Sequence, residues 1–199
     1  MIIHDFEQGT EEWLQARTGK ITGTRINIFL NGRKDTIKKE LLKLAAERIT
    51  NKRCDSDSWT NKHMERGNEL EQQAREVFSI TANKEIKEVG FIERDNFTGC
   101  SPDGLIGDDG LIEIKCKDNH TFLDYAINRK IEKNYYIQMQ YNMWISERDY
   151  CHYIVYNPNF NNPIVTEIVK KDVSLFKEFE ETINNVKNEI DLIIKSIGE

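Results

Sequence analysis

Two carboxylates and a lysine gather in residues 100–117, whose sequence is CSPDGLIGDDGLIEIKCK. Asp103 follows a proline, Glu113 lies ten positions later, and Lys115 comes two positions after Glu113. Residues 111–116 alternate as a strand does, so we expect Glu113 and Lys115 on one face, about 6.6 Å apart along the strand. A carboxylate that holds a metal, next to an ammonium that reaches water or phosphate, is in outline a site for metal-dependent phosphodiester cleavage.

The turn before this strand decides whether Asp103 joins the pair. Residues 108–110, Asp-Asp-Gly, are a turn signal between two apolar runs. A hairpin there would bring Asp103, at the start of the first strand, near Glu113 on the second. With the carbonyl of Ile114, the two carboxylates would give Mg²⁺ or Mn²⁺ three protein ligands. Lys115 would position or deprotonate the attacking water, and a second ion would lie about 3.5–4 Å from the first.

A surface hairpin with solvent-facing charges is the alternative, because short acid and lysine patterns also arise by chance. The apolar neighbours Ile112, Ile114 and Cys116 favour a buried strand instead. A buried strand retains an acid and a lysine only where these groups meet partners. The acids at 103, 108, 109 and 113 do not follow the spacing of a calcium-binding loop, which excludes that kind of site.

The rest of the chain predicts the elements that must position these residues. Residues 51–60 are polar and predict a loop. Caps, turn signals and apolar periodicity predict helices over 10–19, 22–32, 36–49, 61–80, 120–128, 132–146 and 172–197, and strands over 85–94, 97–106, 111–116, 149–156 and 163–169. This order predicts one α/β domain over residues 1–199, with a central mixed sheet flanked by helices.

The composition is that of an ordinary soluble globular protein, with 199 residues, 38% hydrophobic and 31% charged. No apolar run approaches the roughly 18 residues of a membrane span, and the N-terminus lacks the pattern of a signal peptide, so we expect a cytoplasmic protein without a membrane partner. The four cysteines form no C-x-x-C pair, which argues against a structural zinc or iron–sulfur site and predicts reduced thiols.

The net charge of −6 argues against a DNA partner until its distribution is considered. Residues 1–53 carry 11 Lys and Arg against 7 Asp and Glu, whereas residues 54–199 carry 17 against 27. The positive charge of the first part is concentrated in residues 33–43. This run predicts either a nucleic-acid surface or the solvated face of a helix, and charge alone does not separate the two.

Two predicted helices carry polar residues that could reach the site. Glu71 lies four residues before Arg75 and could either pair with it or face a metal. Tyr135 and Gln138 share a helix face, on which Gln138 could orient water or phosphate. From these residues alone, a structural ion pair and an exposed glutamine are the favoured interpretations.

Four segments, in order, resemble the lambda-exonuclease-like family of viral alkaline exonucleases, also called YqaJ-like, of the PD-(D/E)XK superfamily. They are EEWLQARTGKITGT at 11–24, RGNELEQQAR at 66–75, CSPDGLIGDDGLIEIKC at 100–116 and QMQYNMWIS at 138–146. The resemblance covers most of the chain. It implies the restriction-endonuclease-like fold, a central mixed sheet flanked by helices.

The resemblance also implies roles for individual residues. Asp103 and Glu113 match the metal ligands, and Lys115 matches the catalytic lysine. Glu71 matches a helix glutamate beside the metal site, which either binds a second metal ion or contacts the ligands of the first. Gln138 matches a glutamine near the active site.

The same comparison implies a site for the DNA end. Arg17, Thr24 and Ser101 match positions that hold the 5′-terminal phosphate, with Thr24 replacing a serine. A further arginine of the family is missing after Lys115, and Lys117 is the nearest cation. Met64 matches an apolar residue that wedges into the duplex end, and Trp59 competes with it for that role.

The implied activity is a 5′→3′ exonuclease on linear double-stranded DNA that uses Mg²⁺ or Mn²⁺, with two ions expected. It would release mononucleotides and leave 3′ single-stranded overhangs for recombination. Implied partners are a single-strand annealing protein and two further copies of the chain in a homotrimeric ring, in the cytoplasm of a bacterial host if the chain is phage-encoded. The alternatives are a restriction-type or Cas4-like nuclease and a non-catalytic DNA-end-binding recombination protein.

Overall fold

The computed structural model describes residues 1–54 and 62–198, and for residues 62–68 the backbone alone. Within this part no helix is long and apolar enough to cross a membrane, and the four cysteines are thiols. The helices are α1 (Glu11–Arg17), α2 (Gly23–Asn31), α3 (Lys34–Thr50), α4 (Lys62–Ala82), α5 (Asn119–Asn128), α6 (Lys133–Ser146) and α7 (Val173–Ser196). The strands are β1 (Ile2–His4), β2 (Phe91–Glu93), β3 (Gly99–Cys100), β4 (Gly104–Ile106), β5 (Gly110–Cys116), β6 (Tyr150–Tyr156) and β7 (Ile164–Lys170).

The strands form two sheets. The smaller has the order β1-β2-β3 and is antiparallel throughout. The larger has the order β4-β5-β6-β7, with a parallel pair, β5 and β6, between two antiparallel pairs. The chain crosses from β5 to β6 through α5 and α6, because a parallel pair needs a long connection. The fold is therefore a mixed α/β domain, as the element order predicts.

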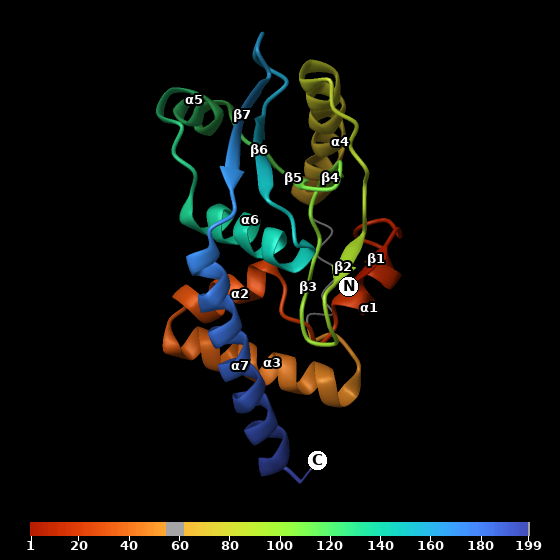
Figure 1. Ribbon diagram of the computed structural model, residues 1–199, viewed down its shortest axis with the longest axis vertical. Coiled ribbons are helices and arrows are strands. Elements are labelled where there is room, and N and C mark those ends of the chain that lie inside the picture. The colour runs from red at the N-terminus through yellow and green to blue at the C-terminus, as the bar shows by residue number, and fades with distance from the viewer. Residues whose placement is uncertain (55–61, 199) are drawn as a thin grey trace.

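Strand β5 is buried on both of its faces. Ile112 and Ile114 pack with Ala74 and Phe78 of α4 in one apolar cluster. On the other face Leu111 belongs to a larger cluster built mainly with α2, α6 and α7. Figure 1 shows α4 beside β4 and β5, with α6 passing below the larger sheet and α2, α3 and α7 beyond it. Polar side chains on β5 therefore lie inside the domain.

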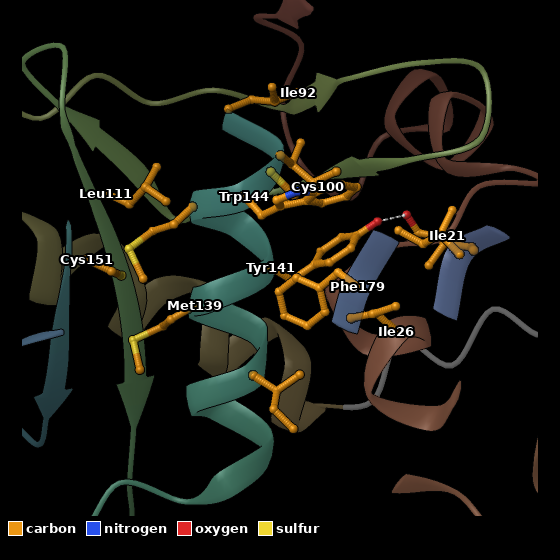
Figure 2. Close-up of a cluster of buried hydrophobic side chains, with 14 of the residues drawn as sticks. Ile21, Ile26, Ile92, Cys100, Leu111, Met139, Tyr141, Trp144, Cys151 and Phe179 are labelled. Carbon is orange, nitrogen blue, oxygen red and sulfur yellow. Dashed lines mark hydrogen bonds between the residues drawn. The ribbon is translucent and has the colours of Figure 1, made fainter. Parts of the chain in front are cut away.

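Helix α6 connects the larger sheet with the N-terminal helices, as Figure 2 shows. Met139, Tyr141 and Trp144 project from it into the larger apolar cluster. The buried Tyr141 hydroxyl donates a hydrogen bond of 2.8 Å to the carbonyl of Ile21, so its one polar group is satisfied. Phe179 of α7 meets the Tyr141 ring edge-on, with the ring centroids 5.4 Å apart. This packing fixes α6 relative to α7 and to the residues just before α2.

The helices lie close to their predicted positions, and local signals explain several ends. Thr10 caps α1 by accepting a hydrogen bond from the amide of Trp13. The basic run lies on α3, where Lys34, Lys38 and Lys39 are exposed and Leu44 is buried. The basic run therefore lies on an exposed face of a helix, which is compatible with both interpretations of its charge.

The predicted strands before the hairpin were wrong in extent. The strand expected over 97–106 is broken into β3 and β4, which belong to different sheets. The break contains Pro102, which has no amide hydrogen to donate to a ladder. The strand expected over 85–94 is reduced to β2, and the N-terminal strand β1 was not predicted.

Candidate active site

The β4–β5 hairpin brings Asp103, Glu113 and Lys115 together, as its turn signal predicts. Gly104 is opposite Ile112 in the antiparallel register, so Asp103 lies next to the middle of β5. Asp103 Oδ2 accepts a hydrogen bond of 2.6 Å from the amide of Ile114. The Lys115 ammonium lies 2.6 Å from Glu113 Oε1. Both strands of the hairpin thus contribute to one polar cluster.

Glu113 is an acid in an enclosed position, with a side chain that is 0% exposed. The Asn142 amide of α6 donates a long hydrogen bond of 3.4 Å to Oε2. Apart from the Lys115 ammonium at 2.6 Å, Oε1 has no hydrogen-bond partner among the described residues. Burial raises the pKa of Glu113 to about 7, although Lys115 lowers it. A buried carboxylate oxygen with unused acceptor capacity is what a cation ligand requires.

Glu71 approaches the hairpin from α4. Its carboxylate accepts a hydrogen bond of 2.9 Å from Arg75, which also donates 3.1 Å to the main-chain carbonyl of Asp103. The guanidinium therefore connects Glu71 with the first residue of the hairpin. Burial, and next the charge of Asp103, raise the pKa of Glu71 to about 8. Glu71 and Asp103 thus lie near enough for strong electrostatic interaction.

The donor set fits a divalent metal with few protein ligands. Within 1–54 and 69–198, whose side chains are described, no three His, Cys, Asp or Glu side chains group closely enough to hold an ion by themselves. Asp103 and Glu113 provide carboxylate oxygens, and Ile114 lies between Glu113 and Lys115 with its amide bound to Asp103. Mg²⁺ usually binds one or two carboxylates and keeps several waters, so this pair suffices.

A second polar site lies around Ser101, two residues before Asp103. The Ser101 hydroxyl accepts hydrogen bonds of 2.9 Å from Arg17 and from the Trp13 indole. The Arg17 guanidinium stacks on the Trp13 ring, 4.2 Å from its centroid. Burial, and then the charges of Arg25 and other cations, lower the pKa of Arg17 to about 10. A partly desolvated cation of this kind is a binding group for an anion.

The other residues predicted for the site have different surroundings. Thr24 is exposed in the first turn of α2. Gly23, its neighbour, touches α6, since a Cβ there would lie 3.1 Å from Cγ of Gln138. Lys117 forms a 2.6 Å ion pair with Glu132.

The two candidates for the duplex-end wedge are not tested. Trp59 lies outside the described residues, and so does the side chain of Met64, although its backbone belongs to α4.

Sequence reasoning missed three residues that contact the site. Asn142 lies four residues after Gln138, so the helix period alone places both on one face. Trp13 lies four residues before Arg17 in the same way, and Arg75 was considered only as a partner of Glu71. The contact between Arg75 and the Asp103 carbonyl has no signal in the sequence, because it depends on the break between β3 and β4.

Comparisons with known proteins show the family and the fold of this chain. The model of the YqaJ-like viral recombinase domain matches residues 12–149. The alkaline exonuclease LHK-Exo of Laribacter hongkongensis is 30% identical, with TM-scores of 0.83 alone and 0.84 in complex with dAMP, over 94% of this chain and 96% of the other. A phage-related exonuclease of Haemophilus somnus, 20% identical with a TM-score of 0.69 over 90% of this chain and 96% of the other, shares the fold.

A viral protein is also related in sequence. An uncharacterized protein of Acanthamoeba polyphaga mimivirus is 25% identical over 178 residues, 76% of this chain. The chain spans about 29% of the length of that relative. The family model covers well over half of the chain and the exonuclease fold covers nearly all of it, so the chain belongs to the YqaJ-like viral recombinase domain family.

Proposed function

We propose that residues 1–199 form a single exonuclease domain that degrades linear double-stranded DNA in the 5′→3′ direction with a divalent metal. It releases mononucleotides and leaves a 3′ single-stranded overhang. The observation that carries the proposal is the convergence of Asp103, Glu113 and Lys115 on one buried hairpin. The relationship to LHK-Exo, which is described as an alkaline exonuclease, supports the same activity.

The carboxylates of the hairpin would hold the metal. Asp103, Glu113 and the carbonyl of Ile114 are the proposed ligands, and Glu71 is a ligand of a second ion or a neighbour of the first. Bound Mg²⁺ or Mn²⁺, proposed as two ions, would polarise the scissile phosphate and stabilise the leaving oxygen. Gln138 would orient water or phosphate, because it shares a helix face with Asn142, which contacts Glu113.

Lys115 acts from the same face as Glu113. Burial lowers its pKa, but the charges of Glu113 and Asp103 outweigh burial and raise the pKa above its usual value. The ammonium is therefore protonated at neutral pH and donates hydrogen bonds. This favours a lysine that positions the attacking water and offsets the charge that develops on the phosphate, rather than one that removes a proton.

Arg17 and Ser101 are the proposed site of the 5′-terminal phosphate. The Arg17 guanidinium and the Ser101 hydroxyl are 2.9 Å apart. A phosphate oxygen there would give the partly desolvated Arg17 guanidinium a charged hydrogen-bond acceptor. Thr24 is a proposed outer contact. Lys117 is a weaker one, because Glu132 already neutralises its charge.

Larger assemblies are also part of the proposal. We propose a homotrimer around duplex DNA and a single-strand annealing protein as the partner that receives the 3′ overhang. The exposed lysines of α3 are candidates for a DNA-facing surface. Size-exclusion chromatography with light scattering tests the trimer directly.

The decisive experiment compares DNA ends. Purified protein is incubated with linear duplex bearing a 5′-phosphate, linear duplex bearing a 5′-hydroxyl and closed circular duplex, each with Mg²⁺, Mn²⁺ or EDTA. We expect mononucleotide release from the linear duplexes only, and only with metal. Nicking of the circular duplex would instead identify an endonuclease, and an inert protein in every metal would reject the nuclease assignment.

Matched variants test the residues. Lys115→Ala should abolish cleavage while gel-shift binding of the duplex is retained, and Lys177→Ala, an exposed lysine of α7, is its control. Arg17→Ala should remove the preference for a 5′-phosphate, with the exposed Arg33→Ala as control. Cleavage by Lys115→Ala at the rate of the unsubstituted protein would remove the role assigned to Lys115.

A further inference from the structure

Two lysine ammonium groups of the site lie over one aromatic ring. Tyr135, in the first turn of α6, has its ring centroid 5.0 Å from Nζ of Lys115 and 5.2 Å from Nζ of Lys117. Both distances are within the roughly 6 Å at which a ring attracts a cation through its quadrupole. The Tyr135 ring is therefore a shared contact for the two cations.

The two ammonium groups share this ring although they carry like charges. Lys115 and Lys117 are two positions apart at the end of β5, so their side chains leave the same side of the chain. Each has its own carboxylate at 2.6 Å, Glu113 for Lys115 and Glu132 for Lys117. The ring adds a third, uncharged group that attracts both cations without neutralising either.

The ring itself is held firmly. Tyr135 packs against Tyr153 of β6, with ring centroids 6.2 Å apart, and Tyr125 of α5 meets Tyr153 edge-on at 5.4 Å. Tyr153 is almost wholly buried. A ring fixed against the core can limit where the flexible lysine side chains place their ammonium groups.

We propose that Tyr135 is a positioning residue for the proposed cleavage reaction: its ring holds the Lys115 ammonium beside Glu113 and keeps Lys117 next to it. The kinetic consequence rests on the proposed nuclease function, whereas the placement of the two lysines does not. The hydroxyl of Tyr135 is not required for this role, since the attraction comes from the face of the ring.

The placement is tested without any reaction. In NMR spectra of protein labelled with ¹³C at the lysine ε-carbons, the ring should shift the ε-proton signals of Lys115 and Lys117 upfield. The two signals are assigned by their loss in Lys115→Arg and Lys117→Arg. The shift should persist in Tyr135→Phe and disappear in Tyr135→Leu. Normal ε-proton shifts in the unsubstituted protein would overturn the proposal.

Kinetic measurements on Tyr135 variants separate a positioning role from a general structural effect. We expect Tyr135→Leu to lower kcat about twofold to thirtyfold, the range that a cation–π contact supplies, with KM for DNA within about twofold. Tyr135→Phe should restore kcat to within about twofold of the unsubstituted protein. Equal loss in the Phe and Leu variants, or none in either, would overturn the role.

Controls guard against misfolding. Tyr136→Leu makes the same change one residue later, where the side chain lies near Gln140 and Asp172 instead of the lysines, and it should leave kcat within about twofold. If Tyr135→Leu does not fold, Tyr135→Met takes its place, because its flexible, unbranched side chain adapts to the space that the ring leaves. An unsubstituted protein that digests no DNA rejects the nuclease function, while the NMR shifts still decide the placement.

Discussion

Metal binding at this site should depend steeply on pH. A metal binds ionised carboxylates, so every proton held by the site in its absence must be released when the metal enters. Glu71 and Glu113 hold such protons, since burial raises their pKa values to about 8 and about 7. Raising the pH therefore removes a competitor of the metal.

The size of the effect follows from those two values. At pH 7 a carboxyl with a pKa of about 8 is about nine-tenths protonated, and one with a pKa of about 7 is about half protonated. At pH 9 both are almost wholly ionised. If the metal binds only when Glu71 and Glu113 are ionised, its apparent affinity rises about twentyfold from pH 7 to pH 9, and at pH 7 binding releases between one and two protons.

Calorimetry can measure both quantities. Mn²⁺ is titrated into DNA-free protein at pH 7 and pH 9, and at each pH in two buffers of different ionisation enthalpy, which counts the protons released. Glu71→Gln should show a much smaller pH dependence, because one of the two competing protons is gone. An affinity that changes less than about twofold, without proton release at pH 7, would refute the reasoning.

Three further predictions concern stability and can be measured by urea unfolding. Without metal, the unfolding free energy should fall as pH rises from about 4.5 to about 8 and then level off, because Glu71 and Glu113 have raised pKa values in the folded state and such carboxyls favour folding only while protonated. Glu113→Gln should make this slope shallower, and an unchanged slope would contradict the assignment. Tyr141→Phe should cost about 1 kcal/mol at constant m-value, since the Ile21 carbonyl loses the Tyr141 hydroxyl and keeps the 3.2 Å hydrogen bond from the Gly99 amide, and an unchanged stability would contradict this contribution. Gly90→Ala should cost roughly 1–3 kcal/mol, because its Cβ would collide with the carbonyl and ring of Phe6, and a stability equal to that of the unsubstituted protein would show that the segment after β1 moves freely.

The elements whose own sequence carries a signal, such as an apolar repeat or a turn, could be predicted. The final helix has an apolar residue every three or four positions, and it forms α7 within one residue of the expected ends. The turn at 108–110 joins two antiparallel strands as predicted. The central pair of the candidate site, Glu113 and Lys115, also follows from alternation alone, because a strand fixes which side chains share a face.

What could not be predicted depends on contacts between distant segments. Residues 97–106 read as one strand, but the chain leaves one sheet after Cys100 and joins the other at Gly104. Lys117 reads as a free cation, yet Glu132, fifteen residues away, forms an ion pair with it. The basic face of α3 was visible as a charge pattern, but its sequence does not say whether DNA or solvent meets it.

The switch between the two sheets has a consequence for the length of the product. Ser101 and Asp103 are separated by one residue, so the chain between them spans at most about 7 Å. If the terminal phosphate binds at Ser101 and the phosphate under attack lies at Asp103, the main chain itself measures the distance from the DNA end to the bond that breaks. A separation this short fits about one nucleotide, and because the connection is a covalent chain it cannot lengthen. An insertion between Ser101 and Asp103 would lengthen this separation, and the size of the released product would report the change.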